Sequence, residues 1–466
     1  MLSANRNITS GAAPSKAGAS GIDINALVDD RVEKEGIFRV SKAIYVDPLI
    51  FELEIEKIFA RSWNYLCHES QVRTVGDYAA LEIARTPVFA IRANDGSVRA
   101  YFDACSHRGA RLTTRRYGRA STITCRYHGW CFDTAGRCLK VQYEKEGWPQ
   151  GTPQGLSLDL TPLPRVANYR GFVFASLAAE GESLESFLGE SRRFIDTMVD
   201  QSPDGIEVLD GSIRYVMRAN WKFQSENGAD GYHVASVHRN YASTVSFREQ
   251  LAGADLDPMK ATEAGRILNR SRTPTGSYDL GQGHMCNWSD RVNTAAIPLA
   301  EREPELLAQH AEGFVRWMVR RGRVLTVFPN FLINDVASTA IRVWRPVSVN
   351  ETELETWCFA PVGESARARE ARIRKFEDFF FPSSLAVPDD VAAMEGAHQG
   401  SEAAQYMGWV RFSRGMEFMQ NGPDEPAEQL ELVPATSNGQ GDSETCFFGF
   451  YRRWRDLMTA ADPEGD

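Results

Sequence analysis

The sequence predicts an α+β fold in two parts: a small antiparallel β domain over residues 63–178, and a larger α+β domain that combines an antiparallel sheet with helices. The chain has 466 residues, more than one domain usually holds. Between residues 63 and 178, short alternating apolar and polar runs are separated by Gly, Asn and Asp, a texture typical of antiparallel strands. From Ser183 onward, helical and strand patterns mix. We therefore assign residues 23–62 and 179–466 to the larger domain.

The N-terminal segment begins with residues 1–22, which are rich in Ser, Ala and Gly and lack the apolar core of a secretory signal. This composition predicts a disordered tail. A helix is expected over residues 24–36 and a stronger one over residues 47–60, where Asp47 suits the N-cap and Pro48 the first helical position. The apolar stripe of the second helix consists of Phe51, Ile55, Ile58 and Phe59.

Strands of the small domain are expected at residues 78–84, 87–93, 97–103 and 171–177, where apolar residues alternate with polar ones. Residues 140–165 contain many Gly and Pro and predict a long surface loop. In the larger domain the predicted helices cover residues 184–200, 221–240, 302–322, 364–381 and 389–398. The predicted strands cover residues 211–218, 323–328, 339–346 and 353–361, and the last two form a hairpin that turns at Asn350-Glu351.

A cluster of metal-ligating residues lies in the small domain. Cys105 and His107 form one Cys-x-His arm, and Cys125 and His128 form a Cys-x-x-His arm after seventeen intervening residues. Two thiolates on one iron and two imidazoles on the other are the ligands of a Rieske [2Fe–2S] cluster. The spacing therefore predicts such a cluster.

The competing interpretation is a zinc site with two Cys and two His ligands. Zinc fingers usually keep the two Cys together and the two His together, whereas here each arm mixes the two types. Gly109 and Gly129 follow the arms and allow sharp turns that bring amide N–H groups toward the sulfurs. Trp130 and Phe132 provide an apolar cover, which suits a redox centre.

Composition restricts the partners. The net charge is −10 and the pI is near 5.5, which disfavours a nucleic-acid partner and an anionic membrane surface. No apolar run has the length of a membrane span. The six other cysteines are scattered, and we interpret them as reduced thiols of a cytoplasmic protein. They are Cys67, Cys131, Cys138, Cys286, Cys358 and Cys446.

A second metal site is predicted around His233 and His238. Open non-haem Fe(II) sites use two His and one carboxylate, which leaves coordination positions free. Five residues of an ideal helix turn by about 500°, so the two imidazoles would lie about 140° apart. The two can share an ion only if the helix is interrupted, and we expect an irregularity near residues 235–237.

An acidic third ligand is expected at a distance along the chain, and Asp389 and Asp390 are the best candidates. Both lie at the start of a predicted helix, where a carboxylate can also serve as a cap. The residue types alone do not choose between them. Asp230 lies one helical turn before His233, where a carboxylate can accept the second N–H of a ligand imidazole and fix its tautomer.

These motifs together resemble a known family. CSHRGARL at 105–112, CRYHGW at 125–130, ENGADGYHVASVH at 226–238 and PDD at 388–390 are similar to the large (α) subunit of Rieske non-haem iron aromatic-ring-hydroxylating dioxygenases. ENGADGYHV, PDDVAAM and IRVWRPVSV resemble the branch that acts on benzoate, toluate and anthranilate. Arg239 stands where that branch has Trp, and residues 268–300 also depart from it. We expect a loop there that lines the substrate entrance.

The resemblance implies a helix-grip (START-like) catalytic domain and a role for each site residue. Cys105 and Cys125 hold one cluster iron, and His107 and His128 hold the other. His233, His238 and Asp390 hold the mononuclear Fe(II). Asp230 connects the Rieske cluster of one subunit to the iron of its neighbour, which implies a head-to-tail ring of three α subunits, alone or with three small β subunits.

The resemblance also implies a reaction. A flavin and iron–sulfur reductase that oxidises NADH supplies electrons, and O₂ adds across the ring of an aromatic acid to give a cis-dihydrodiol. Two alternatives remain open from the motifs. A Rieske monooxygenase such as a salicylate hydroxylase shares every ligand, and an iron–sulfur electron carrier would have two irons per chain instead of three.

Overall fold

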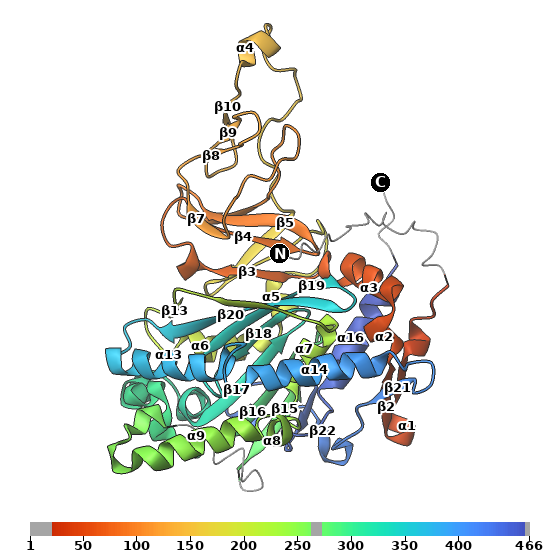
Figure 1. The fold of residues 1–466 in the computed structure, drawn as a ribbon, viewed down its shortest axis with the longest axis vertical. Coiled ribbons are helices and arrows are strands. Elements are labelled where there is room, and N and C mark those ends of the chain that lie inside the picture. The colour runs from red at the N-terminus through yellow and green to blue at the C-terminus, as the bar shows by residue number, and fades with distance from the viewer. Residues whose placement is uncertain (1–20, 262–272, 462–466) are drawn as a thin grey trace, which may run out of the picture.

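The computed structural model describes residues 21–261 and 273–461 and has an elongated shape, with a small β-rich end above a larger body (Figure 1). Every strand pairing in these two ranges is antiparallel, which confirms the predicted α+β class with antiparallel sheets. The predicted tail, residues 1–22, lies outside the described residues except for its last two. Within the described chain, none of the helices combines the length and the apolar character needed to cross a membrane.

A ten-stranded sheet forms the centre of the larger body. Its order is β13-β20-β19-β18-β17-β16-β15-β23-β22, and β14 also pairs with β20. The strands are β13 Ile206–Val208, β14 Ile213–Met217, β15 Thr275–Asp279, β16 Met285–Asp290, β17 Arg321–Val327, β18 Phe331–Asn334, β19 Ala340–Ser348, β20 Glu351–Pro361, β22 Met419–Asn421 and β23 Thr436–Asn438. This sheet is the floor on which the functional site is built.

The two faces of the sheet follow from the alternation of side chains along a strand. Phe331 and Ile333 of β18 point into a core shared with Tyr65 and Phe174 of the small end. Leu332 points to the opposite face, toward α7. Helices α13 and α14 run across the body in front of the sheet (Figure 1). The site lies between these helices and the sheet.

The helices of the body are α5 Leu184–Leu188, α6 Ser191–Val199, α7 Trp221–Ala229, α8 Val234–Val237, α9 Arg239–Ala252, α11 Glu303–Gln309, α12 Glu312–Val315, α13 Ala366–Phe380, α14 Val387–Ser401, α15 Glu425–Glu428 and α16 Phe447–Thr459. The predicted helix 184–200 is divided at Gly189, whose φ is +46°. The predicted helix 302–322 extends too far, because β17 begins at Arg321 and pairs with β16. The hairpin between β19 and β20 turns at Val349 and Asn350, one residue earlier than expected.

The N-terminal segment confirms one prediction and corrects another. Helix α3 Pro48–Glu54 continues into a π-helical turn at Ile55–Phe59, and the Asp47 carboxylate accepts hydrogen bonds from the amides of Leu49 (2.8 Å) and Ile50 (3.4 Å). The predicted helix 24–36 is wrong. Residues Val28–Arg31 form β1, which pairs with β2 Ile37–Ser41, and only one helical turn, α1 Val32–Glu35, lies between them.

The small end contains the strands that the sequence predicts. One sheet has the order β6-β5-β4-β7, and β3 pairs with β12, which pairs with β11. The strands are β3 Asn64–His68, β4 Asp77–Ile83, β5 Thr86–Arg92, β6 Val98–Phe102, β7 Tyr117–Arg119, β11 Arg165–Tyr169 and β12 Phe172–Ser176. The far part carries β8 Ile123–Thr124, β9 Cys131–Phe132 and β10 Cys138–Lys140 (Figure 1). The predicted loop 140–165 holds one helical turn, α4 Glu144–Gly147.

Candidate metal centres and substrate cavity

Two arms in the far part of the small end fold in the same way. The amide of Gly109 donates to the carbonyl of Cys105 (2.8 Å), and the amide of Gly129 donates to the carbonyl of Cys125 (3.0 Å). Both glycines have φ of +71°, a left-handed conformation that other residues rarely adopt. Each cysteine is thus followed, four residues later, by the glycine that closes its turn.

The four predicted cluster ligands lie around one space. Cys105 and Cys125 are buried, whereas His107 is exposed and His128 is half-buried. The two imidazole rings are 4.6 Å apart between centroids, and the indole of Trp130 stacks on His107 at 4.7 Å with 9° between the planes. The arms therefore place their sulfurs inside the domain and their imidazoles toward its surface.

The surroundings of these side chains fit a redox cluster. Burial raises the pKa of the Cys105 thiol, while hydrogen bonds from the backbone amides of His107 and Arg108 oppose that rise. Amide donors to sulfur favour the thiolate form that binds metal. In the described part of the chain, Nδ1 of His128 is buried without a hydrogen-bond partner, a vacancy that a metal bond would fill. Two sulfurs and two ring nitrogens form the donor set of a Rieske cluster.

The second candidate centre is built on an interrupted helical segment. Helix α7 ends at Ala229, the single turn α8 spans Val234–Val237, and α9 begins at Arg239. His233 precedes α8, and His238 follows it with φ −92° and ψ 13°, outside the helical region of both neighbours. The predicted interruption is therefore present, but it lies at His238 instead of within residues 235–237.

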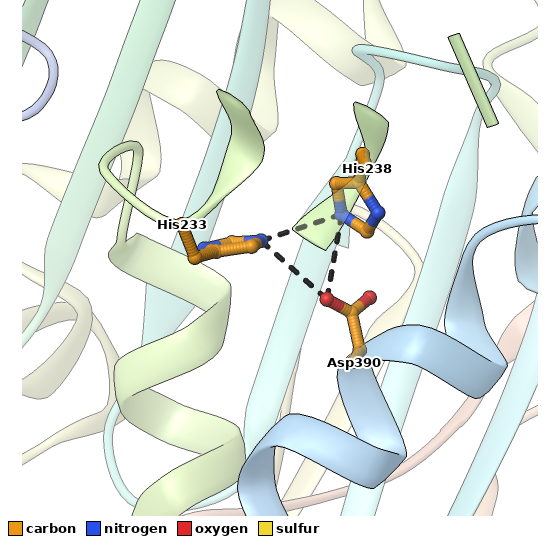
Figure 2. A group of neighbouring side chains, drawn as sticks. All are labelled: His233, His238 and Asp390. Carbon is orange, nitrogen blue, oxygen red and sulfur yellow. Dashed lines mark hydrogen bonds and ion pairs between the residues drawn. The ribbon is translucent and has the colours of Figure 1, made fainter. Parts of the chain in front are cut away.

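His233, His238 and Asp390 point their polar atoms at one another (Figure 2). Nε2 of His233 lies 3.3 Å from Nε2 of His238, and Oδ1 of Asp390 lies 3.5 Å and 3.4 Å from these two nitrogens. The centre of such a triangle is about 2 Å from each atom, a metal–ligand bond length. Two imidazoles and one carboxylate on one side of an ion are the ligand set of non-haem Fe(II) oxygenases.

The structure distinguishes the two aspartates of α14. Asp390 is buried and faces the histidines, whereas Asp389 is half-buried and lies in a shallow groove with Arg239. Helix α14 begins at Val387, and its N-cap residue Ala386 makes no side-chain cap. Asp389, for which the sequence left a capping role open, is therefore not the N-cap residue, because the helix begins two residues before it.

Asp230 binds the other side of the His233 ring. Its Oδ2 lies 3.2 Å from Nδ1 of His233, and its carboxylate also accepts hydrogen bonds from the amides of Tyr232 (2.5 Å) and His233 (3.2 Å). Burial raises the pKa of Asp230, but these hydrogen bonds outweigh it and hold the pKa below its usual value. An ionised Asp230 fixes the proton of His233 on Nδ1, which makes Nε2 the unprotonated nitrogen and hence the one that can bind a metal.

Asn227 is a site residue that sequence reasoning missed. Its Nδ2 donates to Oδ1 of Asp390 (3.1 Å) and lies 3.5 Å from Nε2 of His233. Asn227 lies on α7, three residues before Asp230, so the stretch ENGADGYHV carries a polar residue toward the centre at every third position: Asn227, Asp230 and His233. That periodicity is the signal that could have found it.

A cavity of about 150 Å³ lies beside the three converging atoms. Helices α7, α13 and α14 form its roof, and strands β15 to β19 form its floor. Phe379 packs against His238 with 5.2 Å between ring centroids, and Phe380 follows it on the wall. Polar lining residues besides the three that converge include Thr275, Asn287, Ser289, Asn334, Arg342 and Lys375.

The segment 268–300, for which we expected a loop at the substrate entrance, contributes residues to the lining of this cavity, and much of its described part is strand. Its described part forms strands β15 and β16 in the middle of the sheet, and residues 268–272 lie outside the described residues. Thr273, Thr275, Asn287, Ser289, Ala296 and Ile297 contribute to the lining.

Comparisons with known proteins agree with this geometry. A model of the Rieske [2Fe–2S] domain matches residues 62–167, and a model of the ring hydroxylating alpha subunit (catalytic domain) matches residues 207–460. Toluate 1,2-dioxygenase subunit alpha of Pseudomonas putida is 40% identical over 444 residues and covers 95% of each chain. The 2-halobenzoate 1,2-dioxygenase large subunit of Burkholderia cepacia is 38% identical over 452 residues, covering 96% of this chain and 95% of the relative.

Anthranilate 1,2-dioxygenase large subunit of Acinetobacter baylyi is 36% identical over 447 residues, covering 93% of this chain and 92% of the relative. Among solved structures, a naphthalene 1,2-dioxygenase with indole in its active site superposes with a TM-score of 0.80 at 24% identity. That alignment covers 94% of this chain and 95% of the other. This structural likeness concerns the fold.

Proposed function

The chain belongs to the family of Rieske ring-hydroxylating dioxygenase α subunits, and on that premise we propose that it cis-dihydroxylates an aromatic carboxylate with a single ring. Members of this family use a Rieske [2Fe–2S] cluster and a mononuclear iron. The observation that carries the proposal is the convergence of His233, His238 and Asp390 on the wall of the cavity.

We assign the cofactors to the residues that fit them. Cys105, His107, Cys125 and His128 would hold the cluster, and His233, His238 and Asp390 would hold the iron. When bound, the cluster supplies single electrons and the iron supplies O₂ activation at its open coordination positions. Around them, Asp230 orients His233, Asn227 holds the Asp390 carboxylate, and Phe379 limits access of water to His238.

The cavity size supports a substrate with one ring. A cavity of about 150 Å³ accommodates one benzene ring and little more. Toluate, 2-halobenzoate and anthranilate, the compounds in the names of the three relatives, are all aromatic acids with one ring. We therefore place the substrate in this class.

We further propose that the two centres of one reaction belong to neighbouring subunits. The arms near β8 and β9 lie at one end of the molecule and α8 lies at the other (Figure 1). Asp230 is 24% exposed and His107 is exposed, so each can meet a second copy of the chain. A head-to-tail ring of three α subunits brings such surfaces together, and Asp230 would then connect the two centres.

The relatives are named as subunits, and partners are proposed accordingly. A reductase with flavin and iron–sulfur groups would oxidise NADH and deliver the electrons. A small β subunit would complete the assembly, as three copies on the ring.

We also propose the division into a Rieske domain, residues 63–178, and a catalytic domain, residues 23–62 and 179–466. Residues of the N-terminal helix α3 and of α16 belong to the same hydrophobic core, which supports assigning residues 23–62 to the catalytic domain.

The test is product analysis under ¹⁸O₂ with a reconstituted NADH reductase and benzoate, 2-chlorobenzoate, anthranilate or salicylate. Two labelled oxygens in a cis-diol, or in the catechol formed from anthranilate, are expected. One labelled oxygen would indicate a monooxygenase of the same architecture. Three irons and two acid-labile sulfides per chain are expected, whereas two irons would indicate an electron carrier.

A further inference from the structure

Among the residues that the structure describes, the buried arginines have carboxylate partners, with one exception. In the described chain five arginines are buried: Arg321, Arg323, Arg342, Arg345 and Arg372. Four of them form ion pairs, with Asp290, Asp335, Glu353 and Glu364 respectively. Across the same described residues, Arg342 has no carboxylate within 4 Å. A buried cation without a counter-charge is destabilising unless a bound group supplies one.

The contacts of Arg342 leave part of its guanidinium free. Nε donates to Oγ1 of Thr356 (3.1 Å) and Nη1 donates to Oε1 of Gln224 (3.4 Å). Nη2 is buried and has no hydrogen-bond partner among residues 21–261 and 273–461. Arg342 is 5% exposed and lines the cavity. An unused donor on a fork-shaped cation is suited to a carboxylate.

Arg342 lies close to the three converging atoms. Its Cζ is 5.6 Å from the ring centroid of Phe380, while the neighbouring Phe379 contacts His238. On the floor, Arg342 is directly opposite Leu332 in the β18–β19 register, and Leu332 lies under Gly228 of α7. The guanidinium therefore lies on the side of the cavity between Phe380 and the floor below α7, the helix that leads to His233.

Lys375 is the other buried cation of the cavity, but it is placed differently. Its Nζ already donates to the carbonyl of Ala296, and the residue also borders a second cavity lined by Gln201 and Arg291. On α13 it lies one turn before Phe379, away from His238. The Lys375 amine already has a hydrogen-bond acceptor, whereas Nη2 of Arg342 has none in the described chain.

We propose that the guanidinium of Arg342 binds the carboxylate of the aromatic acid and gives the site its preference for acids over neutral aromatic compounds. This proposal rests on the proposed function. Addition of oxygen at ring positions 1 and 2, as the names of the relatives specify, makes the carbon that bears the carboxylate a reacting atom. The carboxylate must then be bound beside the iron, where Arg342 is, and not at the distant end of the cavity.

The test compares two ligands of nearly equal shape. Nitrobenzene has the outline of benzoate but no net charge. Anaerobic calorimetric titration of the complete oxygenase with each compound gives the two dissociation constants. Arg342→Gln is expected to weaken benzoate binding by about 10- to 100-fold and to change nitrobenzene binding by less than about threefold, because the lost contact is a charge-assisted hydrogen bond. Arg342→Lys, which retains charge without the fork, should give an intermediate value for benzoate.

Three further measurements make the outcome decisive. Iron content, cluster absorbance and nitrobenzene binding report whether the variants are folded. Arg374→Gln removes the same charge from the exposed side of α13 and should leave both constants unchanged. Unchanged benzoate binding in Arg342→Gln, or a loss confined to Lys375→Gln, would overturn the assignment of Arg342. Wild-type enzyme that binds nitrobenzene but none of the acids would overturn the substrate class itself, and the role of Arg342 with it.

Discussion

Oδ2 of Asp230 lies 3.2 Å from Nδ1 of His233, so one carboxylate holds the imidazole whose other nitrogen faces Asp390. The same carboxylate is 24% exposed, whereas Asp390 is 5% exposed. Asp230 thus lies between the predicted iron site and the protein surface, whereas Asp390 lies on the buried side of that site.

Asp230→Ala is expected to leave both metal centres bound but to reduce product formation by more than about 100-fold, because the iron ligand loses its orienting partner and the path to the neighbouring subunit is broken. Iron and sulfide analysis should give wild-type values. Product yield per NADH should fall with the rate. Normal coupled product formation in this variant would contradict the connecting role of Asp230.

Asp390→Ala is expected to remove the mononuclear iron while the cluster remains, because only Asp390 of the pair reaches the two histidines. The iron content should fall from three irons per chain to two, while the visible absorbance of the cluster stays unchanged. Asp389→Ala is the matched control, since its side chain lies in the outer groove. Loss of one iron in the Asp389 variant and retention in the Asp390 variant would reverse the assignment.

Gly228→Ala is expected to damage the site by displacing α7. A Cβ at this position would lie 2.5 Å from Cδ1 of Leu332 and 3.0 Å from Oγ1 of Thr326, so either the buried Leu332 side chain or the helix must shift. We expect a loss of about 1–3 kcal/mol in the free energy of unfolding, together with reduced iron content.

The control for this substitution is Gly396→Ala on α14, where an added Cβ meets no atom within 4 Å. There the exchange should raise the free energy of unfolding by about 0.5–1 kcal/mol, since Ala is the better helix former. Thermal or urea unfolding measures both. Equal free energies of unfolding for the two variants would show that the packing of α7 on β18 accommodates an added Cβ at position 228, which would contradict the prediction.

The ligand arms and the N-cap at Asp47 could be predicted because their signals are local: a fixed spacing, a cap residue and a proline next to it. The helix predicted over residues 24–36 failed because β1 pairs with β2, a contact that periodicity within one segment does not contain. Strands β15 and β16 were missed for a similar reason. They are central strands whose polar residues face a cavity, so the usual apolar alternation is absent.

In the candidate site, too, some residues could be predicted from local sequence signals and others depend on contacts between distant segments. The sequence indicated the histidines and the two aspartates, but the choice between Asp389 and Asp390 depends on how α14 faces α8. Arg342 carries no sequence signal, since an arginine in a strand is usually paired or exposed. Arg342 differs from the other buried arginines of the described chain because no carboxylate lies beside it, and this difference can be recognised only in the three-dimensional structure.

The Glu226 carboxylate gives the fold a dependence on pH. It accepts hydrogen bonds from the hydroxyls of Tyr45 (2.7 Å) and Tyr451, both fully buried, and thereby connects α7 to α2 (Ala43–Val46) and α16. Removal from water raises its pKa from 4.5 to about 7, although the two tyrosines and the nearby Lys222 act in the opposite direction. Between pH 4.5 and about 7, Glu226 is therefore mostly protonated in the folded protein, whereas the same side chain is mostly ionised in the unfolded chain.

Because the folded state binds the extra proton between pH 4.5 and about 7, the stability due to Glu226 is present at low pH and is lost as the pH rises through that window. Glu226→Gln keeps an oxygen acceptor for both tyrosines and cannot ionise. The variant should lie within about 1 kcal/mol of wild type at pH 5 and exceed it at pH 8 by at most roughly 3 kcal/mol. Unfolding midpoints measured from pH 5 to pH 8 test this, with Glu417→Gln on the exposed surface as the control. A variant that is less stable than wild type at pH 8 would show that the ionised carboxylate is the form the fold prefers.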